Sequence, residues 1–126
     1  MNKSLLIRSY VLLIRIDFMM KARSLQSIHR LLRRQRLCFR DRNKTYQIDT
    51  LCRTIDLACV LYVKPVLCLQ RSAATTLLLR RYGWPAEMVI GAQVLPFKSH
   101  AWVEVEGAVV NDKPYVREIF SVLERC

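Results

Sequence analysis

Three side chains that together could carry out acyl-transfer chemistry lie in the second half of the chain, namely Cys68, His100 and Asp112. A thiol is mostly protonated near its ordinary pKa, and the thiolate is the form that attacks a carbonyl carbon, so a catalytic cysteine needs activation. A histidine can accept the thiol proton, and a carboxylate can fix the tautomer of the imidazole. The set therefore predicts a cysteine nucleophile with a histidine base and an orienting aspartate.

The residues around Cys68 predict the start of a helix. Pro65 disfavours helix before it, and no further helix breaker occurs until Gly83 and Pro85. Gly83 suits the left-handed position just past a helix end, and Pro85 cannot continue the helix. We expect Cys68 within about the first turn, where unpaired N–H groups and the helix dipole stabilise a thiolate or an oxyanion.

His100 and Asp112 lie in a predicted β-hairpin of residues 100–112, with its turn at Gly107. Alternation along the first strand puts His100 and Trp102 on one face. Trp102 is expected to pack against the cysteine helix or to form a wall of the site. The geometry of this hairpin decides whether the aspartate can reach the histidine.

The register of the hairpin depends on the length of its loop. A three-residue loop over 105–107, with the glycine in a left-handed bulge, predicts these pairs: Glu104 with Ala108, Trp102 with Val110, and His100 with Asp112. Directly opposed residues have Cβ atoms about 5 Å apart, close enough for a carboxylate to bond an imidazole. A two-residue loop would instead pair Asp112 with Ala101, on the other face. We favour the three-residue loop.

Two other residues compete for roles in this site. His29 lies among basic residues without an evident carboxylate partner, which favours a surface side chain. Glu104 shares a face with His100, but it lies four residues along the strand, about 13 Å away, so Asp112 is the better partner. Beyond the backbone at Cys68, the choice of oxyanion donor stays open among Tyr62, Gln70 and Gln93.

Several short runs resemble a known family. They are Cys68-Leu69-Gln70-Arg71-Ser72, Leu79-Arg80-Arg81-Tyr82-Gly83, Val89-Ile90-Gly91, Pro96-Phe97, His100-Ala101-Trp102-Val103-Glu104-Val105 and Asn111-Asp112. These runs are similar to the lasso-peptide leader peptidases, a transglutaminase-like branch of the papain-like cysteine proteases. The resemblance covers residues 60–112, and Gln70 departs from it because relatives often have proline or another residue there.

The resemblance implies hydrolysis of a peptide bond, with Cys68 as nucleophile, His100 as general base and acid, and Asp112 as orienting carboxylate. The family removes the leader of a ribosomally made precursor before a separate ATP-dependent synthetase closes the macrolactam. The implied partners are the precursor peptide and a separate leader-recognition protein, with the macrolactam synthetase as a further candidate, because this chain looks too short for a fused recognition domain. No cofactor or metal is expected.

The overall pattern predicts one α+β domain over residues 1–126, in which 52% of residues are apolar. Residues 1–44 are expected to form a basic helical region, with helices over 4–20 and 24–37. Residues 45–126 are expected to form the transglutaminase-like core. There, a helical stripe from Ile48 to Tyr62 precedes the cysteine helix, residues 86–95 form a strand, and Val116 to Leu123 form a short helix or strand.

Charge is concentrated in the basic region, which has 12 Lys or Arg and 2 Asp or Glu (+10), against 9 and 8 (+1) in residues 45–126. Such a basic set can attract nucleic acid, anionic lipid or an acidic peptide or protein, or it can be a solvated helix face, and the sequence does not choose among these. For a peptidase that relies on a separate recognition protein, our hypothesis is that the set docks the precursor or that protein. The set comprises Lys21, Arg23, Arg30, Arg33, Arg34, Arg36, Arg40, Arg42 and Lys44. A noncatalytic basic adaptor, a nucleic-acid-binding module and a thiol acyltransferase are the alternatives, although no nucleic-acid-binding motif accompanies the charge.

The N-terminal segment is too interrupted by charge to span a membrane, because Arg8 and Arg15 break its apolar run. We interpret it as a docked helix whose broad apolar surface serves burial or partner contact. No secretory signal is evident, and five cysteines without a metal-type pair favour a reducing cytoplasm. Cys52 and Cys59 are expected to pack in the core.

Overall fold

The computed structural model describes residues 3–22, 25–35 and 46–126. The helices in this part are α1 (Lys3–Ala22), α2 (Leu25–Gln35), α3 (Ile48–Leu61), α4 (Cys68–Arg81) and α5 (Val116–Ile119). The strands are β1 (Ala86–Gln93), β2 (Lys98–Val105), β3 (Ala108–Val109) and β4 (Ser121–Arg125). The α+β class is confirmed, and the expected elements are present. Several members of the basic set named above lie outside the described residues: Arg23, Arg36, Arg40, Arg42 and Lys44.

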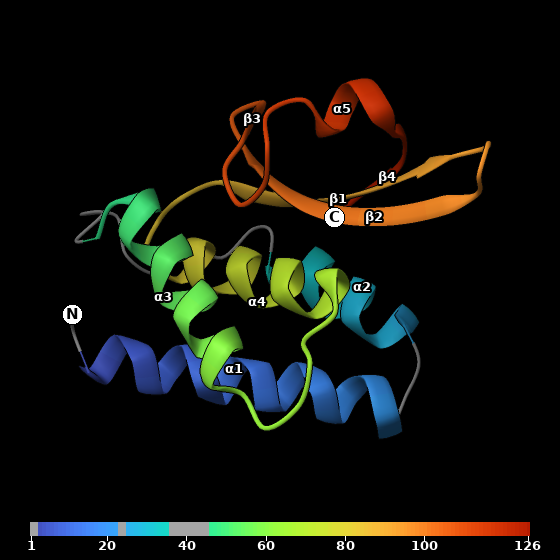
Figure 1. Cartoon of the computed structure of the whole chain (residues 1–126). Helices are drawn as coiled ribbons and strands as arrows, with labels where there is room; N and C mark the ends of the chain where they lie inside the picture. Colours follow the sequence, from blue (N-terminus) through green and yellow to red (C-terminus); the bar gives the residue numbers. More distant parts are fainter. Residues whose placement is uncertain (1–2, 23–24, 36–45) are drawn as a thin grey trace.

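The cysteine helix α4 lies at the centre of the fold, between α1 on one side and the sheet on the other (Figure 1). It is buried almost all round, because small residues such as Ala73 and Ala74 let its neighbours approach closely. The hydroxyl groups of Thr75 and Thr76 donate to the carbonyls of Arg71 (2.7 Å) and Ser72 (2.8 Å). Their burial therefore leaves no hydroxyl without a partner.

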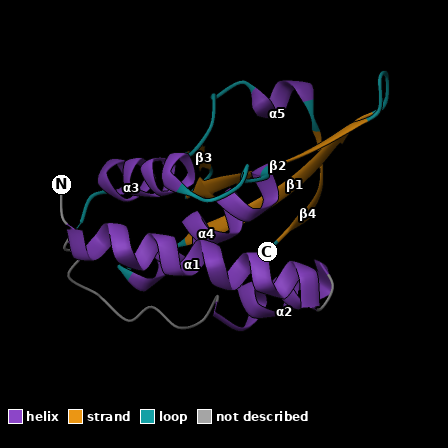
Figure 2. Cartoon of the chain, turned by 60° about the horizontal axis from the view of Figure 1, so that its bottom comes forward, coloured by secondary structure: helices purple, strands orange, loops and turns teal. Residues whose placement is uncertain are grey.

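The sheet is antiparallel, with the strand order β3-β2-β1-β4. On the face toward α4, Val103 and Val105 join a core with Leu78 and Leu79. The opposite face lies toward α5, which connects to the edge strand β4 (Figure 2). The sheet therefore has one face on the helices and a second, smaller aromatic core on the other side.

The C-terminal end of α4 is fastened by Arg80, whose residue is only 1% exposed. Its guanidinium donates to the carbonyls of Ala86 (2.8 Å), Cys126 (2.8 Å) and Leu32. These acceptors belong to the first residue of β1, the residue after β4, and α2. One side chain thus holds three separate segments against the end of the cysteine helix, and its buried donors are satisfied by backbone oxygens.

The expected three-residue hairpin loop is wrong. The observed pairs are Val105 with Ala108 and Glu104 with Val109, so the loop has two residues. Both of these, Glu106 and Gly107, have positive φ angles of 52° and 84°. Positive φ at both central positions is the hairpin turn whose twist matches that of the flanking strands. The expectation placed only the glycine in the left-handed region, and Glu106 adopts that conformation as well.

No helix among the described residues combines the length and the apolar character needed to cross a bilayer.

Gly91 on β1 allows the aromatic core to approach the sheet. A Cβ atom there would lie 2.7 Å from Cη2 of Trp102 and 2.9 Å from Cβ of Phe120. We expect Gly91→Ala to lower the free energy of unfolding by about 1–3 kcal/mol because these atoms must move. Chemical denaturation measures the loss, and the near-ultraviolet circular dichroism should change as the Trp102 ring shifts.

Gly107→Ala is the matched comparison, since its Cβ would meet nothing within 4 Å and only its φ of 84° is unfavourable. It should lose about 1–2 kcal/mol without the spectral change. An unaltered aromatic spectrum in Gly91→Ala would show that the close contact is unimportant.

Candidate active site

Cys68 is the first residue of α4, directly after the N-cap Leu67, as the position of Pro65 predicts. Its side chain is partly exposed. The first bond along the helix runs from the Arg71 N–H to the Leu67 carbonyl (3.0 Å). The N–H groups of residues 68–70 therefore have no acceptor within the helix, which is the environment that favours a thiolate and an oxyanion.

The segment before Cys68 is tied to α1 through Asp17. Its carboxylate accepts from the Gln70 amide (3.0 Å) and the Tyr62 hydroxyl (3.1 Å), and it pairs with Lys64 (2.8 Å). The Gln70 carbonyl oxygen in turn accepts from the Leu67 N–H (3.0 Å), which completes one half of a capping box. The departure at Gln70 from the family pattern thus has a structural role beside the cysteine.

These contacts bear on the side chains considered as oxyanion donors. Tyr62 and Gln70 donate to Asp17, and the Gln93 amide donates to the Pro96 carbonyl (3.1 Å) on an exposed turn. All three amide or hydroxyl groups are engaged in contacts within the fold. The backbone N–H groups at the start of α4 are therefore the better candidates for binding an oxyanion.

His100 and Asp112 are brought together, with the imidazole Nε2 bonded to Oδ2 of the carboxylate. The other carboxylate oxygen accepts from the Lys113 N–H (2.8 Å). Burial alone would raise the pKa of Asp112, but the hydrogen bonds from His100 and Lys113 outweigh it and leave the pKa below its usual range. Asp112 is therefore ionised at neutral pH, and Nδ1 is the imidazole nitrogen left for other chemistry.

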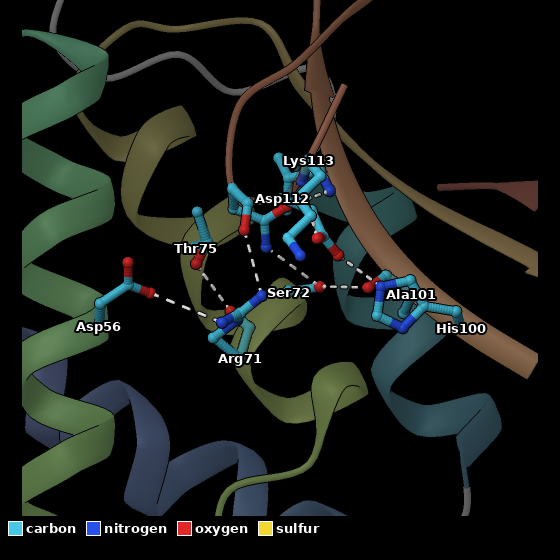
Figure 3. A network of polar contacts seen from close by, with 10 residues as sticks. Asp56, Arg71, Ser72, Thr75, His100, Ala101, Asp112 and Lys113 are labelled. Carbon is cyan, nitrogen blue, oxygen red and sulfur yellow. Dashed lines mark hydrogen bonds and ion pairs between the residues drawn. The ribbon is translucent and has the colours of Figure 1, made fainter. Parts of the chain in front are cut away.

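Asp112 reaches the histidine through the loop and not through the strand ladder. The Asn111 carbonyl oxygen accepts from Arg71 (3.1 Å), its side-chain oxygen accepts from the Val103 N–H (2.7 Å), and its amide donates to the Ser72 hydroxyl (3.3 Å). The Asn111 side chain thus bonds β2 where a longer β3 would have paired with it. Asp112, the next residue, lies beside His100. Figure 3 shows Arg71, Ser72, Asp112 and His100 in one polar network.

The ring of His100 lies in an aromatic environment. It stacks beside Trp102 (6.1 Å between centroids) and lies near Phe120 (5.3 Å). Trp102 packs with Val89 and Phe120 on the sheet face away from α4, so of the two expected roles it forms a wall of the site. Aromatic rings on one side and a carboxylate on the other restrict the orientations open to the imidazole.

Glu104 does not compete for the histidine. Its residue is 2% exposed, and its carboxylate accepts from Trp102 Nε1 (2.9 Å) and pairs with Arg125 (3.0 Å). Burial alone would raise its pKa, but the bonds from Trp102 and Arg125 outweigh that and lower it. Glu104 therefore fixes the indole that lies beside His100, which is a positioning role.

Cys68 and His100 belong to segments that meet at the edge of β2. Ser72, one helical turn after Cys68, donates to the carbonyl of Ala101, the residue after His100 (3.0 Å). The His100 side chain itself projects from the face opposite α4, as does Trp102. The helix that begins with Cys68 and the strand that carries His100 are therefore joined by a direct hydrogen bond.

The expectation for His29 is wrong, because it has a carboxylate partner. Its Nδ1 lies 3.1 Å from Glu124, which also accepts from Arg33 (2.7 Å). Glu124 lies in β4, 95 residues after His29 in the sequence, and this contact brings β4 beside α2. Donor atoms of His29, Glu124 and Cys126 lie within 4.8 Å of one another, but the Arg33 guanidinium lies 2.7 Å from Oε1 of Glu124, and its positive charge would repel a cation there. We assign no metal to this cluster.

The other described cysteines differ from Cys68 in their surroundings. Burial raises the pKa of the Cys52 thiol to about 12 and also raises that of Cys59. Cys52 is part of the core, and Cys59 packs against it, as expected from their spacing. A raised pKa leaves little thiolate at neutral pH, so neither is a good nucleophile.

Comparison with known proteins agrees with the similarity noted in the sequence. The transglutaminase-like superfamily matches residues 12–125. The Microcin J25-processing protein McjB of Escherichia coli is 45% identical over 56 residues, which are 44% of this chain and 27% of that protein. The match therefore spans about a quarter of that relative. No solved structure matches the chain significantly.

Asn111 makes a testable contribution to this arrangement. Asn111→Ala leaves the Val103 N–H without its acceptor and removes the bond that the Asn111 amide donates to Ser72, so we expect the free energy of unfolding to fall by about 1–3 kcal/mol. Lys113→Ala is the control, because only the backbone N–H of Lys113 contacts Asp112. Denaturant titration should show a loss in the first variant and little change in the second; equal stability of both would contradict the role of Asn111.

The contacts of Asp17 predict a pH-dependent stability. The contact with Lys64 lowers the pKa of Asp17, and the hydrogen bond from the Tyr62 hydroxyl lowers it as well. Burial acts in the opposite direction but is outweighed. A lowered folded-state pKa stabilises the fold above the ordinary carboxyl range, near pH 4, and this stability disappears as pH falls through the folded-state pKa. Asp17→Asn should therefore be less stable than wild type at neutral pH, and the difference should shrink in acid.

Thermal melts at neutral pH and at stepwise lower pH measure this difference. Asp49→Asn provides the control, since Asp49 is exposed and its contact with Arg53 is 3.6 Å long. If the gap between wild type and Asp17→Asn stayed constant down to strongly acidic pH, the carboxylate would not be the source of the stability.

Proposed function

Because the chain belongs to the transglutaminase-like superfamily, we propose that it is a cysteine peptidase that removes the leader of a ribosomally made lasso-peptide precursor. The observation that carries the peptidase assignment is the His100–Asp112 bond, located where α4 begins to contact β2 through Ser72 and Ala101. In this proposal Cys68 is the nucleophile, His100 is the general base and acid, and Asp112 orients the imidazole.

The first half of the reaction forms a thioester. His100 takes the thiol proton on Nδ1, since Nε2 is bonded to Asp112, and the Cys68 sulfur attacks the scissile carbonyl carbon. The carbonyl oxygen becomes an oxyanion, which the backbone N–H groups at the start of α4 bind. His100 then gives its proton to the leaving amine, the C–N bond breaks, and the new N-terminus departs.

The second half releases the leader. A water molecule gives a proton to His100 and attacks the thioester carbon, and the C–S bond breaks as the proton returns to sulfur. Asp112 stays ionised throughout, because its pKa is held below the usual range. Its negative charge stabilises the imidazolium that exists between the two proton transfers.

The substrate class rests on the relative. The McjB protein is named for processing microcin J25, and 45% identity over 56 residues supports a processing role for this chain. We propose that the precursor peptide is the substrate and that a separate leader-recognition protein delivers it. The macrolactam synthetase would then act on the freed amine.

Mass spectrometry of a precursor incubated with the protein and its recognition partner tests the proposal. Wild type should release the leader, whereas Cys68→Ala and His100→Ala should lose at least about 100-fold in rate while remaining folded. Asp112→Asn should be impaired but less severely, because the imidazole keeps a hydrogen-bonding partner.

Cys59→Ala is the matched cysteine control, since burial raises the pKa of Cys59 and the proposal gives it no role. Full leader release by Cys68→Ala would refute the assignment of the nucleophile. A wild-type thioester resolved only by added amines, with no hydrolysis product, would instead support an acyltransferase.

A further inference from the structure

Helix α1 has apolar side chains on two sides, and one of these sides is open to solvent. Leu5, Leu13 and Ile16 are buried against the rest of the protein. The outward side carries Ile7, Val11, Ile14 and Phe18, which are 63%, 47%, 47% and 70% exposed. In Figure 1, α1 forms the outermost layer, on the side of α4 away from the sheet. Large apolar side chains gathered on one exposed helix face indicate a binding surface.

The spacing of these residues specifies the kind of partner. Positions 7, 11, 14 and 18 follow steps of four, three and four residues, the repeat by which one helix packs along another. We call this set the outer seam of α1. It is narrow, because Arg8 and Arg15 lie directly along one side of it. An interfacial membrane helix needs a wider apolar face, so a partner helix fits the outer seam better.

The charges beside the outer seam specify the partner further. Arg8 and Arg15 occupy equivalent positions seven residues apart, where coiled-coil helices place the charges that choose a partner. Both are exposed, and Arg8 is held in place by its bond to the Tyr82 hydroxyl (2.7 Å). On the other side, Asp17 is neutralised by Lys64 at 2.8 Å. The seam therefore presents positive charge to whatever packs on it.

A second copy of this chain does not satisfy these constraints. Antiparallel pairing of two outer seams would set Arg8 of one copy near Arg15 of the other, and each chain carries a formal net charge of +11. We infer that the outer seam of α1 binds an amphipathic helix of a different protein, one with an apolar seam flanked by acidic residues. This inference uses no residue of the proposed active site and does not depend on the peptidase activity.

The test uses two synthetic helical peptides, each about three heptads long, with leucine seams flanked either by Glu or by Lys. Fluorescence anisotropy with the full chain should show about tenfold or greater preference for the Glu-flanked peptide. Val11→Gln, which keeps the helix but removes an apolar contact, should weaken binding of that peptide about tenfold or more. Arg15→Glu should reduce the preference for the Glu-flanked peptide about fivefold or more, because it replaces one of the two positive charges beside the outer seam by a negative one.

Arg53→Glu on α3 is the matched control, because it changes the net charge equally at an exposed site that is not part of the outer seam. It should leave the preference unchanged. Equal binding of both peptides, or an Arg53→Glu effect as large as that of Arg15→Glu, would overturn the inference. Seam-dependent self-association in sedimentation, or Val11-dependent binding to anionic phospholipid vesicles without peptide binding, would overturn it in favour of a second copy or a membrane.

Discussion

The hydrogen bond from Ser72 to the carbonyl of Ala101 is the contact on which the candidate site depends, because it joins the helix that begins with Cys68 to the strand that carries His100. Both groups are buried, so a missing partner would cost the desolvation of a polar group. The same hydroxyl accepts from Asn111. The Ser72 side chain therefore joins the three segments that carry Cys68, His100 and Asp112, the residues that the proposed chemistry requires.

The cysteine helix is held at both ends by polar contacts that differ in kind. At its start, Gln70 joins the Leu67 N–H to Asp17 of α1, and at its end Arg80 donates to backbone carbonyls from three segments. Between them, alanine, threonine and leucine side chains fill the space between α1 and the sheet. Such fixed ends limit the movement of Cys68 at the first residue of α4, which is the orientation that the proposed reaction requires of a nucleophile.

The aromatic side of the sheet makes a second contribution, independent of the helix. Gly91 lets Trp102 and Phe120 lie close to the strand, and both rings border the imidazole of His100. Glu104, which on sequence grounds competed with Asp112, instead holds the indole of Trp102. The two carboxylates considered as partners of His100 thus have separate tasks, because Asp112 bonds the imidazole and Glu104 bonds the Trp102 side chain beside it.

The amino-acid sequence by itself determined the order of the elements, the position of Cys68 in the first turn of α4 and the broad apolar surface of α1, because these follow from local helix breakers and from periodicity. It did not determine the hairpin register, since Glu106 was not expected at positive φ, nor the partner of His29, which is 95 residues distant. The sequence predicted that His100 and Asp112 would meet as directly opposed residues of two strands. In the structure they meet although β3 ends before Asp112, because Asn111 is hydrogen-bonded to β2 and holds the loop in place. Only the tertiary structure could decide this, because those bonds join residues whose proximity depends on the packing of α4 against the sheet.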